Sequence, residues 1–273
     1  MQVACIQPKI YQDRNECYNA VENILNDLKI KENKCELACL PERWVPFHKR
    51  GNQNFQSERG KDYLVIQNLA KKYKINILSG AIWEKRADFE KPFITCYYFN
   101  DKGEEIGRQD KIHLYTYEKE HFEPGKEIKI FKVNKLDCFS ILICFDMAFW
   151  ETPRIAVENG ADILFSPTQI REDGMHNWNI YLQARALENR VPIVACNTFG
   201  NFFKKKFLGY SKIISFYEGK ISPSKLKIVE GPRNTSGYIF DKVDINFPKK
   251  LREIRLSEKI DKKKIKVIKV DKY

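Results

Sequence analysis

Short apolar runs alternate along the chain with stretches in which apolar residues recur every third or fourth position. The short runs are typical of buried strands, and the longer pattern is typical of helices that pack by one face. We expect helices over residues 15–31, 62–74, 153–159 and 176–189. We expect strands over residues 3–7, 36–40, 76–83, 93–100, 105–109, 131–133, 139–144, 163–165, 193–197, 212–216 and 238–243.

The alternation of strands and helices also contains hairpins. Asp101-Lys102-Gly103 separates two strands, and its glycine can supply the positive φ of a tight turn. Such a pattern predicts a layered α/β fold with mixed sheets. Because no long linker, repeat or low-complexity segment appears, we expect one domain over 1–250 and a charged extension over 251–273. Within the extension, Lys264–Val270 alternates like a strand, which predicts pairing with a sheet edge or with another subunit.

Composition narrows the classes of function. The chain of 273 residues carries a net charge of +12, but its lysines are scattered, with small clusters at 204–206 and 262–264. We interpret them as a solvated surface and expect no nucleic-acid partner. No apolar run is long enough to span a membrane, and the amino terminus lacks a signal-peptide pattern, so we expect a cytoplasmic protein. The eight cysteines form no Cys-x-x-Cys, which favours reduced thiols and no metal site.

Four residues near the ends of predicted strands have side chains suited to nucleophilic catalysis. Cys144 directly follows residues 140–143 of a predicted buried strand, although a single cysteine in such a place is more often structural. Glu42 follows a buried strand, and Lys111 and Glu118 follow the hairpin. A carboxylate can take the proton of a thiol, and an ammonium can stabilise the thiolate and then an oxyanion. Together these residues predict a thiol hydrolase.

At these residues the chain resembles the nitrilase, or carbon–nitrogen hydrolase, superfamily. The segments that carry the resemblance are, in chain order, Leu40-Pro41-Glu42, Gly107 to Leu114, Glu118 to Gly125, Ile143-Cys144-Phe145-Asp146, Glu151, Arg154, Gly160 to Leu164, Pro167, Trp178, Ala184 to Asn189, Asn197, Gly200 and Gly209-Tyr210-Ser211. The resemblance implies a four-layer αββα sandwich of two mixed sheets between helices. It also implies a homodimer or a larger homo-oligomer.

The resemblance further implies a role for each candidate residue. Cys144 is the expected nucleophile, Glu42 the general base and Lys111 the stabiliser of the oxyanion, with Glu118 supporting the lysine. The backbone N–H of Phe145 is expected to complete the oxyanion hole. No metal and no organic cofactor is implied, and the partner is a small-molecule amide or N-carbamoyl compound. The expected reaction releases ammonia or an amine through a cysteine acyl-enzyme.

The residues after the nucleophile narrow the substrate. True nitrilases usually carry Cys-Trp-Glu, whereas Cys144-Phe145-Asp146 resembles the amidase and carbamoylase branches. Residues 147–150 contain no arginine that could pair with a carboxylate of the substrate. We therefore expect a neutral or partly apolar acyl group, contacted by Phe149 or Trp150 as well as Phe145. An equally good interpretation is that Met147 and Phe149 only pack against the start of the following helix.

Three alternatives remain open at this point. They are nitrile hydrolysis, a glutaminase-type or acyltransferase role with a partner, and a non-catalytic basic binding protein. The intact set of Glu42, Lys111, Glu118 and Cys144 argues against the last. Arg185 and Glu188, three apart on a predicted helix, are expected to form a structural ion pair or a subunit contact. His113 and His121 are expected to be solvated loop residues.

Overall fold

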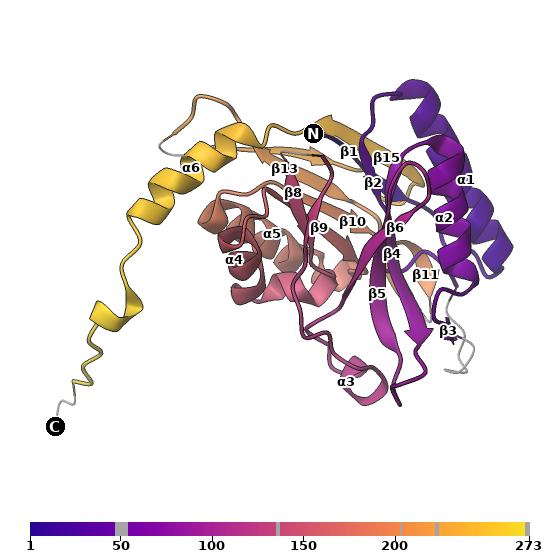
Figure 1. Cartoon of the computed structure of the whole chain (residues 1–273), viewed down its shortest axis with the longest axis horizontal. Helices are drawn as coiled ribbons and strands as arrows, with labels where there is room; N and C mark the ends of the chain where they lie inside the picture. Colours follow the sequence, from indigo (N-terminus) through magenta and orange to yellow (C-terminus); the bar gives the residue numbers. More distant parts are fainter. Residues whose placement is uncertain (47–53, 135–136, 203, 222–223, 271–273) are drawn as a thin grey trace.

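The computed structural model (Figure 1) describes residues 1–46, 54–134, 137–202, 204–221 and 224–270. Two mixed sheets pack face to face, and helices cover their outer faces. This confirms the αββα sandwich that the resemblance to the nitrilase superfamily implies. The last three residues of the predicted extension lie outside the described residues.

The first sheet joins the start of the chain to a strand near its end. Its strands are β1 (Gln2–Gln7), β2 (Leu37–Cys39), β3 (Gln56–Ser57), β4 (Asn76–Lys85), β5 (Phe93–Phe99), β6 (Glu105–Asp110) and β15 (Gly237–Lys242). The order is β15-β1-β2-β4-β5-β6, with β3 paired to β4. Strands β1, β2 and β4 run parallel, so their carboxyl ends lie at the same end of the sheet.

The second sheet is built from the later part of the chain. Its strands are β7 (Ile130–Lys132), β8 (Cys138–Ile141), β9 (Ile163–Thr168), β10 (Ile193–Asn197), β13 (Lys212–Phe216) and β14 (Leu226–Glu230). The order is β14-β13-β10-β9-β8-β7, and β8, β9 and β10 run parallel. A separate hairpin pairs β11 (Phe199–Phe202) with β12 (Lys205–Leu208).

Helices close the sandwich on both sides. α1 (Arg14–Lys31) and α2 (Lys61–Tyr73) pack on the first sheet, and α4 (Glu151–Glu158) and α5 (Met175–Asn189) pack on the second. Asp13 begins α1 by accepting hydrogen bonds from two first-turn N–H groups, the arrangement of an N-cap. Other helical segments in the described ranges are α3 (Glu118–His121), α6 (Asn246–Ser257), and the 3₁₀ turns η2 (Cys144–Ala148), η3 (Glu172–Gly174) and η4 (Lys262–Lys264).

The apolar side chains divide into layers that follow this architecture. One cluster between the sheets combines Leu78 and Cys96 of the first sheet with Phe139 and Phe165 of the second. Separate clusters lie under α1 and α2 and under α4 and α5. Strands buried on both faces explain why their sequences are apolar runs rather than alternating patterns.

The structure departs from the predicted elements in a few places. The strand predicted over 139–144 ends at Ile141, because Cys144 begins a 3₁₀ turn. β3, β11, β12, β14, α3 and α6 were not predicted. Residues 265–270 have exposed side chains and no regular structure, so the strand alternation there forms no strand within this chain, and pairing with another subunit stays a prediction. The domain boundary at residue 250 also stays a prediction, and α6 runs across it.

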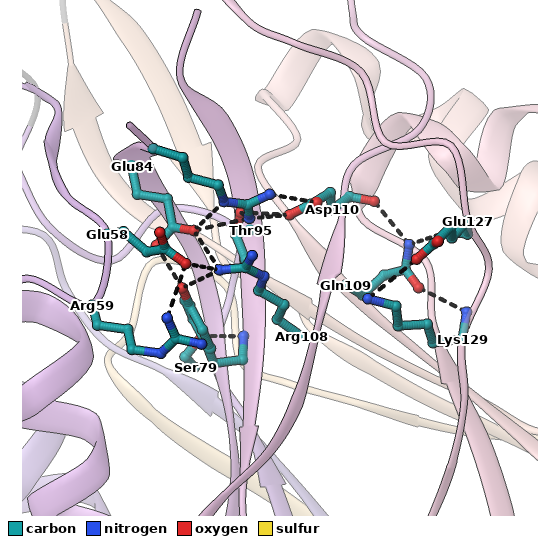
Figure 2. A network of polar contacts seen from close by, with 12 residues as sticks. Glu58, Arg59, Ser79, Glu84, Thr95, Arg108, Gln109, Asp110, Glu127 and Lys129 are labelled. Atoms are coloured by element: carbon teal, nitrogen blue, oxygen red, sulfur yellow. Dashed lines mark hydrogen bonds and ion pairs between the residues drawn. The ribbon is translucent and has the colours of Figure 1, made fainter. Parts of the chain in front are cut away.

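A buried network of charged side chains holds the carboxyl end of β6. The Arg86 guanidinium contacts Glu84 at 2.9 Å and Asp110 at 2.6 Å, and it donates to Thr95 at 2.8 Å. Figure 2 shows how this network continues across the neighbouring strands to Glu58. Buried charges are tolerated when each is paired in this way. The network therefore fixes the backbone just before Lys111.

Candidate active site

Three strands from the two sheets bring the predicted residues into one cavity. Glu42 follows β2, Lys111 follows β6, and Cys144 follows β8. These residues and Glu118 line a single cavity of about 580 Å³. Chain positions that are far apart thus meet where strands of both sheets end.

The loop that carries Glu42 contacts both sheets through its backbone. Its N–H donates to the carbonyl oxygen of Thr168 in β9, at 3.1 Å, which ties this loop of the first sheet to the second. On the other side, Gly80 sits in a bulge of β4 with φ +66°, and a Cβ there would lie 2.1 Å from the Pro41 carbonyl oxygen. Only glycine leaves room for the turn that carries Glu42.

Lys111 lies between two carboxylates. Its Nζ is 2.8 Å from Glu42 Oε1 and 2.7 Å from Glu118 Oε2, and its side chain is 1% exposed. Burial by itself favours the neutral amine, but the charges of Glu42 and Glu118 raise the pKa of Lys111 well above its ordinary value. Burial also raises the pKa of Glu118, against the opposing effect of Lys111. The ammonium is therefore charged and rigidly held.

Cys144 occupies a turn with an unusual backbone. Its φ is +47°, a left-handed conformation that non-glycine residues seldom adopt, and it begins the 3₁₀ turn η2. The side chain is buried yet lines the cavity. Burial and then the charge of Glu42 raise the pKa of the thiol well above its ordinary value, while Lys111 lowers it. Burial and the nearby Glu42 carboxylate thus favour the protonated form of the thiol, whereas Lys111 favours the thiolate.

Asp146 ties the cysteine turn to the lysine loop. Its carboxylate is fully buried and accepts hydrogen bonds from the Ile143 N–H at 2.9 Å and the His113 N–H at 2.7 Å. The Ile112 N–H lies 3.2 Å away, and His113 Nδ1 3.1 Å away. One side chain thus fixes the relative positions of the segments that carry Cys144 and Lys111.

We expect Asp146→Asn to lower both stability and turnover. The new amide nitrogen cannot accept, so a buried N–H loses its partner, at a cost of about 1–3 kcal/mol. Thermal unfolding should show the loss, and kcat should fall more than KM rises. Asp162→Asn is the matched control, since this buried aspartate accepts from the Cys138 N–H at the opposite end of β8. Equal losses of kcat in both variants would contradict the proposal that Asp146 positions Cys144 relative to Lys111.

A second support holds the far end of η2. Arg185 donates to the carbonyl oxygens of Met147 at 3.1 Å and Ala148 at 2.9 Å. It also pairs with Glu188 at 2.9 Å, which confirms the predicted ion pair within α5. The three-residue spacing of Arg185 and Glu188 predicts their ion pair. It does not predict that Arg185 also donates hydrogen bonds to the turn that contains Cys144.

The predicted substrate-contacting aromatics separate in space. Phe145 lines the cavity, as expected, but Phe149 and Trp150 are not among its lining residues. Phe149 instead stacks on His113, with ring centroids 4.0 Å apart. Trp150 is 43% exposed and lines another hollow, between α4 and the end of α6. A 3₁₀ turn has three residues per turn, so Phe145 and Ala148 face the cavity together while Phe149 turns away.

The rest of the cavity wall was not predicted. It comes from the loop before α3, from the segment after β9, from α5 and from the β11–β12 hairpin. The residues are Tyr115, Thr116, Tyr117, Gln169, Ile170, Arg171, Gly174, Asn177, Trp178, Tyr181, Phe202, Lys205 and Phe207. Those outside the hairpin follow strand β6 or β9 or lie in the first two turns of α5, whereas Phe202, Lys205 and Phe207 lie within the strands of the hairpin.

Neither a metal cluster nor a membrane helix occurs in the described ranges. No group of three or more His, Cys, Asp or Glu side chains there is arranged to hold a metal ion. No helix there is both long and apolar enough to cross a membrane. The arrangement described above uses a thiol, two carboxylates and an ammonium.

Comparison with known proteins decides the family. The family model described as Carbon-nitrogen hydrolase matches residues 2–246. The chain belongs to the carbon-nitrogen hydrolase family. This carbon-nitrogen hydrolase is 29% identical to a Schizosaccharomyces pombe protein named as a probable nitrilase, over 92% of the chain and 91% of that protein. It is 28% identical to a Bacillus subtilis 2-oxoglutaramate amidase, over 82% of the chain and 84% of that protein.

Solved structures of the same family share the fold. A Saccharomyces cerevisiae member of branch 10 of the nitrilase superfamily superposes with a TM-score of 0.81 at 20% sequence identity, covering 97% of each chain. A carbon-nitrogen hydrolase from Helicobacter pylori also reaches 0.81, at 19% identity, covering 95% of this chain and 94% of that one. The αββα architecture of this carbon-nitrogen hydrolase is therefore that of its family.

Proposed function

We propose that this carbon-nitrogen hydrolase cleaves the C–N bond of small amides through a Cys144 acyl-enzyme. One arrangement carries the proposal: the Lys111 ammonium lies between Glu42 and Glu118 in the cavity that Cys144 lines. The thiol has a raised pKa and needs a base, and Glu42 is the carboxylate whose charge acts on it most strongly. The site thus supplies a nucleophile, a base and a fixed cation.

The reaction proceeds in two halves. In the first, Cys144 Sγ attacks the amide carbon while Glu42 takes the thiol proton, and the oxyanion is held by Lys111 and the Phe145 N–H. Glu42 then gives that proton to the leaving nitrogen, the C–N bond breaks, and a thioester remains. In the second half, Glu42 takes a proton from water as the water attacks the thioester. The C–S bond breaks, and the proton returns to the sulfur.

Glu118 supports this chemistry without carrying the proton. It contacts Lys111 with both oxygens, at 2.9 and 2.7 Å, and accepts from the Tyr115 N–H at 2.7 Å. The ammonium is therefore anchored from the side away from Glu42. Lys111 can then shift its remaining hydrogen bond toward a developing oxyanion without losing its charge partner.

Two observations favour an amide rather than a nitrile as the bond that is cleaved. Cys144-Phe145-Asp146 differs from the Cys-Trp-Glu usual in true nitrilases. Relatives of this chain include proteins named as 2-oxoglutaramate amidase and omega-amidase. Both favour an amide over a nitrile.

A screen for released ammonia tests the proposed function. Primary amides, N-carbamoyl amines and nitriles are offered to the wild type and to Cys144→Ala in parallel. We expect hydrolysis of amides well above that of nitriles, and none with the variant. Preferential hydrolysis of nitriles, or ammonia release that survives in Cys144→Ala, would contradict the proposal.

The homodimer or larger assembly implied by the resemblance remains part of this proposal. Trp150 and Ile155 are 43% and 46% exposed and line the same hollow beside α4. Exposed apolar groups that gather on one face are typical of a protein interface. We infer that another subunit covers this face.

A further inference from the structure

Asn197 is one of the residues that carry the resemblance to the family, yet the chemistry proposed for Cys144 does not use it. It is 1% exposed and is not among the lining residues of the cavity. It ends β10 and is the register partner of Thr168, the last residue of β9. The backbone ladder between these two strands stops at this pair. The Asn197 side chain therefore lies where the segment after β9 leaves the sheet.

The carboxamide of Asn197 continues the pairing beyond the end of the ladder. Its Oδ1 accepts from the Ile170 N–H at 2.7 Å, and its Nδ2 donates to the Ile170 carbonyl oxygen at 3.2 Å. A carboxamide offers the same kinds of donor and acceptor as a peptide group. It therefore pairs with both backbone groups of Ile170, as a neighbouring strand would.

The other hydrogen bonds of Asn197 anchor it to a fixed part of the molecule. Nδ2 also donates to the Gly209 carbonyl oxygen at 2.7 Å, and the Asn197 N–H donates to the Ser211 hydroxyl at 3.0 Å. Gln7 of β1 accepts from the N–H and the hydroxyl of Ser211, at 3.0 and 2.9 Å. Gly209 has φ +71°, which suits glycine, and a Cβ there would lie 2.3 Å from the Gln7 carboxamide. The asparagine is thus tied to a strand of the first sheet.

The segment that Asn197 holds lies beside the nucleophile. Gln169 and Ile170 line the same cavity as Cys144. Burial and then the charge of Glu42 raise the pKa of the Cys144 thiol, while Lys111 and a backbone hydrogen bond from Gln169 lower it. Because Ile170 directly follows Gln169, a displacement of Ile170 also moves that backbone group. A residue outside the cavity therefore controls a group next to the sulfur.

We propose that Asn197 is a positioning residue that holds the Gln169–Ile170 backbone in place beside Cys144. This inference rests on the proposed function and adds to it a residue outside the cavity. The Asn197 side chain acts through the backbone of Ile170 and takes no part in proton transfer. It fixes the geometry around the thiol, so its effect is expected in kcat rather than in KM.

Three variants separate this role from simple structural support. Asn197→Ala removes both hydrogen bonds to Ile170, whereas Asn197→Asp keeps the acceptor for the Ile170 N–H but loses the amide donor. Asn76→Ala is the matched control, because Asn76 Nδ2 donates to the Glu36 carbonyl oxygen at 2.6 Å at the opposite, amino end of β4. Each variant is measured for ammonia release, for thermal unfolding and for alkylation of Cys144 by iodoacetamide, followed by peptide mass.

We expect Asn197→Ala to lower kcat by about 10- to 100-fold with little change in KM, because a small displacement beside the reacting atoms is costly. Asn197→Asp should keep more of kcat than Asn197→Ala, although its buried carboxyl group makes it at least as unstable. Asn76→Ala should lose stability and keep the kcat of the wild type. Activity and stability should therefore rank the variants differently.

Alkylation of Cys144 reports on the same contact without any substrate, because the thiolate is the form that reacts. The pH profile of the alkylation rate should move to higher pH in Asn197→Ala, since the backbone hydrogen bond that lowers the thiol pKa is weakened. Glu42, Lys111 and Tyr117 also interact with the thiol, and they are present in every variant. The shift should be smaller in Asn197→Asp and absent in the control.

A loss of kcat in Asn197→Ala no larger than in Asn76→Ala would overturn the positioning role. So would an alkylation profile that coincides with that of the wild type, or kcat values that simply follow the melting temperatures. Should Asn197→Ala not fold, Asn197→Asp decides, and wild-type values of kcat and of the alkylation profile in it would overturn the proposal. Absence of Cys144-dependent ammonia release would overturn the proposed function alone, since alkylation needs no amide substrate.

Discussion

Cys144→Ala should abolish amide hydrolysis and leave the fold intact. Removing the nucleophile of a covalent hydrolase lowers kcat by about 10⁵- to 10⁶-fold. Alanine is smaller than cysteine, and it meets the same positive φ that cysteine already meets at this position. Ammonia release measures the loss, and circular dichroism with thermal unfolding verifies the fold.

Cys138→Ala is the matched control for the nucleophile. Cys138 begins β8, the strand that leads toward Cys144, but it does not line the cavity. We expect full activity from this variant. Intact-mass measurement of quenched reactions should show an acyl adduct on the wild type and on Cys138→Ala, and none on Cys144→Ala. An adduct on another cysteine would reject the assignment.

Lys111→Met should have the second-largest effect. The loss of one oxyanion donor lowers kcat by about 10²- to 10³-fold. The variant also leaves the buried carboxylates of Glu42 and Glu118 without the ammonium between them, which adds a cost in stability. Methionine preserves most of the volume of the lysine side chain. The substitution therefore leaves no large void, and the loss of stability reports on the missing charge. Lys119→Met, an exposed lysine beside Glu118, is the control.

The stability of Lys111→Met should depend on pH in a defined direction. Burial already raises the pKa of Glu118, and removal of Lys111 takes away the charge that opposes this rise. A carboxyl group with a raised pKa in the folded state favours folding while it is protonated. That benefit is lost as pH rises from the unfolded value of about 4.3 through the folded value. The difference in melting temperature from the wild type should widen from pH 4 to pH 8, and a constant difference would contradict the coupling.

The residues around Cys144 were predictable because strand ends in this fold converge. Glu42 and Cys144 each follow an apolar run, and Lys111 follows the second strand of a hairpin. Each signal is weak by itself, and the resemblance to the nitrilase superfamily is what joined the three residues into one predicted site. The hairpin β11–β12 was not predictable, because its two strands have four residues each and contain Lys205 and Lys206, which look like a solvated surface in the sequence. For the same reason, Lys205 was not predicted to line the cavity.

The positions of Phe149 and Trp150 could not be read from the sequence either. Their placement depends on whether the residues after Cys144 continue as strand, α-helix or 3₁₀ turn. Each of these directs a side chain five residues on to a different side. Asp146 and Arg185 determine the turn through hydrogen bonds to backbone groups, and neither spacing nor hydropathy encodes those bonds.

The hydrogen bond from the Glu42 N–H to Thr168 has a consequence for folding. The proposed base and cation come from the first sheet and the proposed nucleophile from the second, so neither half of the chain contains a complete site. A refolding molecule with only one sheet formed holds either Cys144 or its partners. Activity should therefore return only with the docking of the two sheets, after most of the secondary structure has already formed.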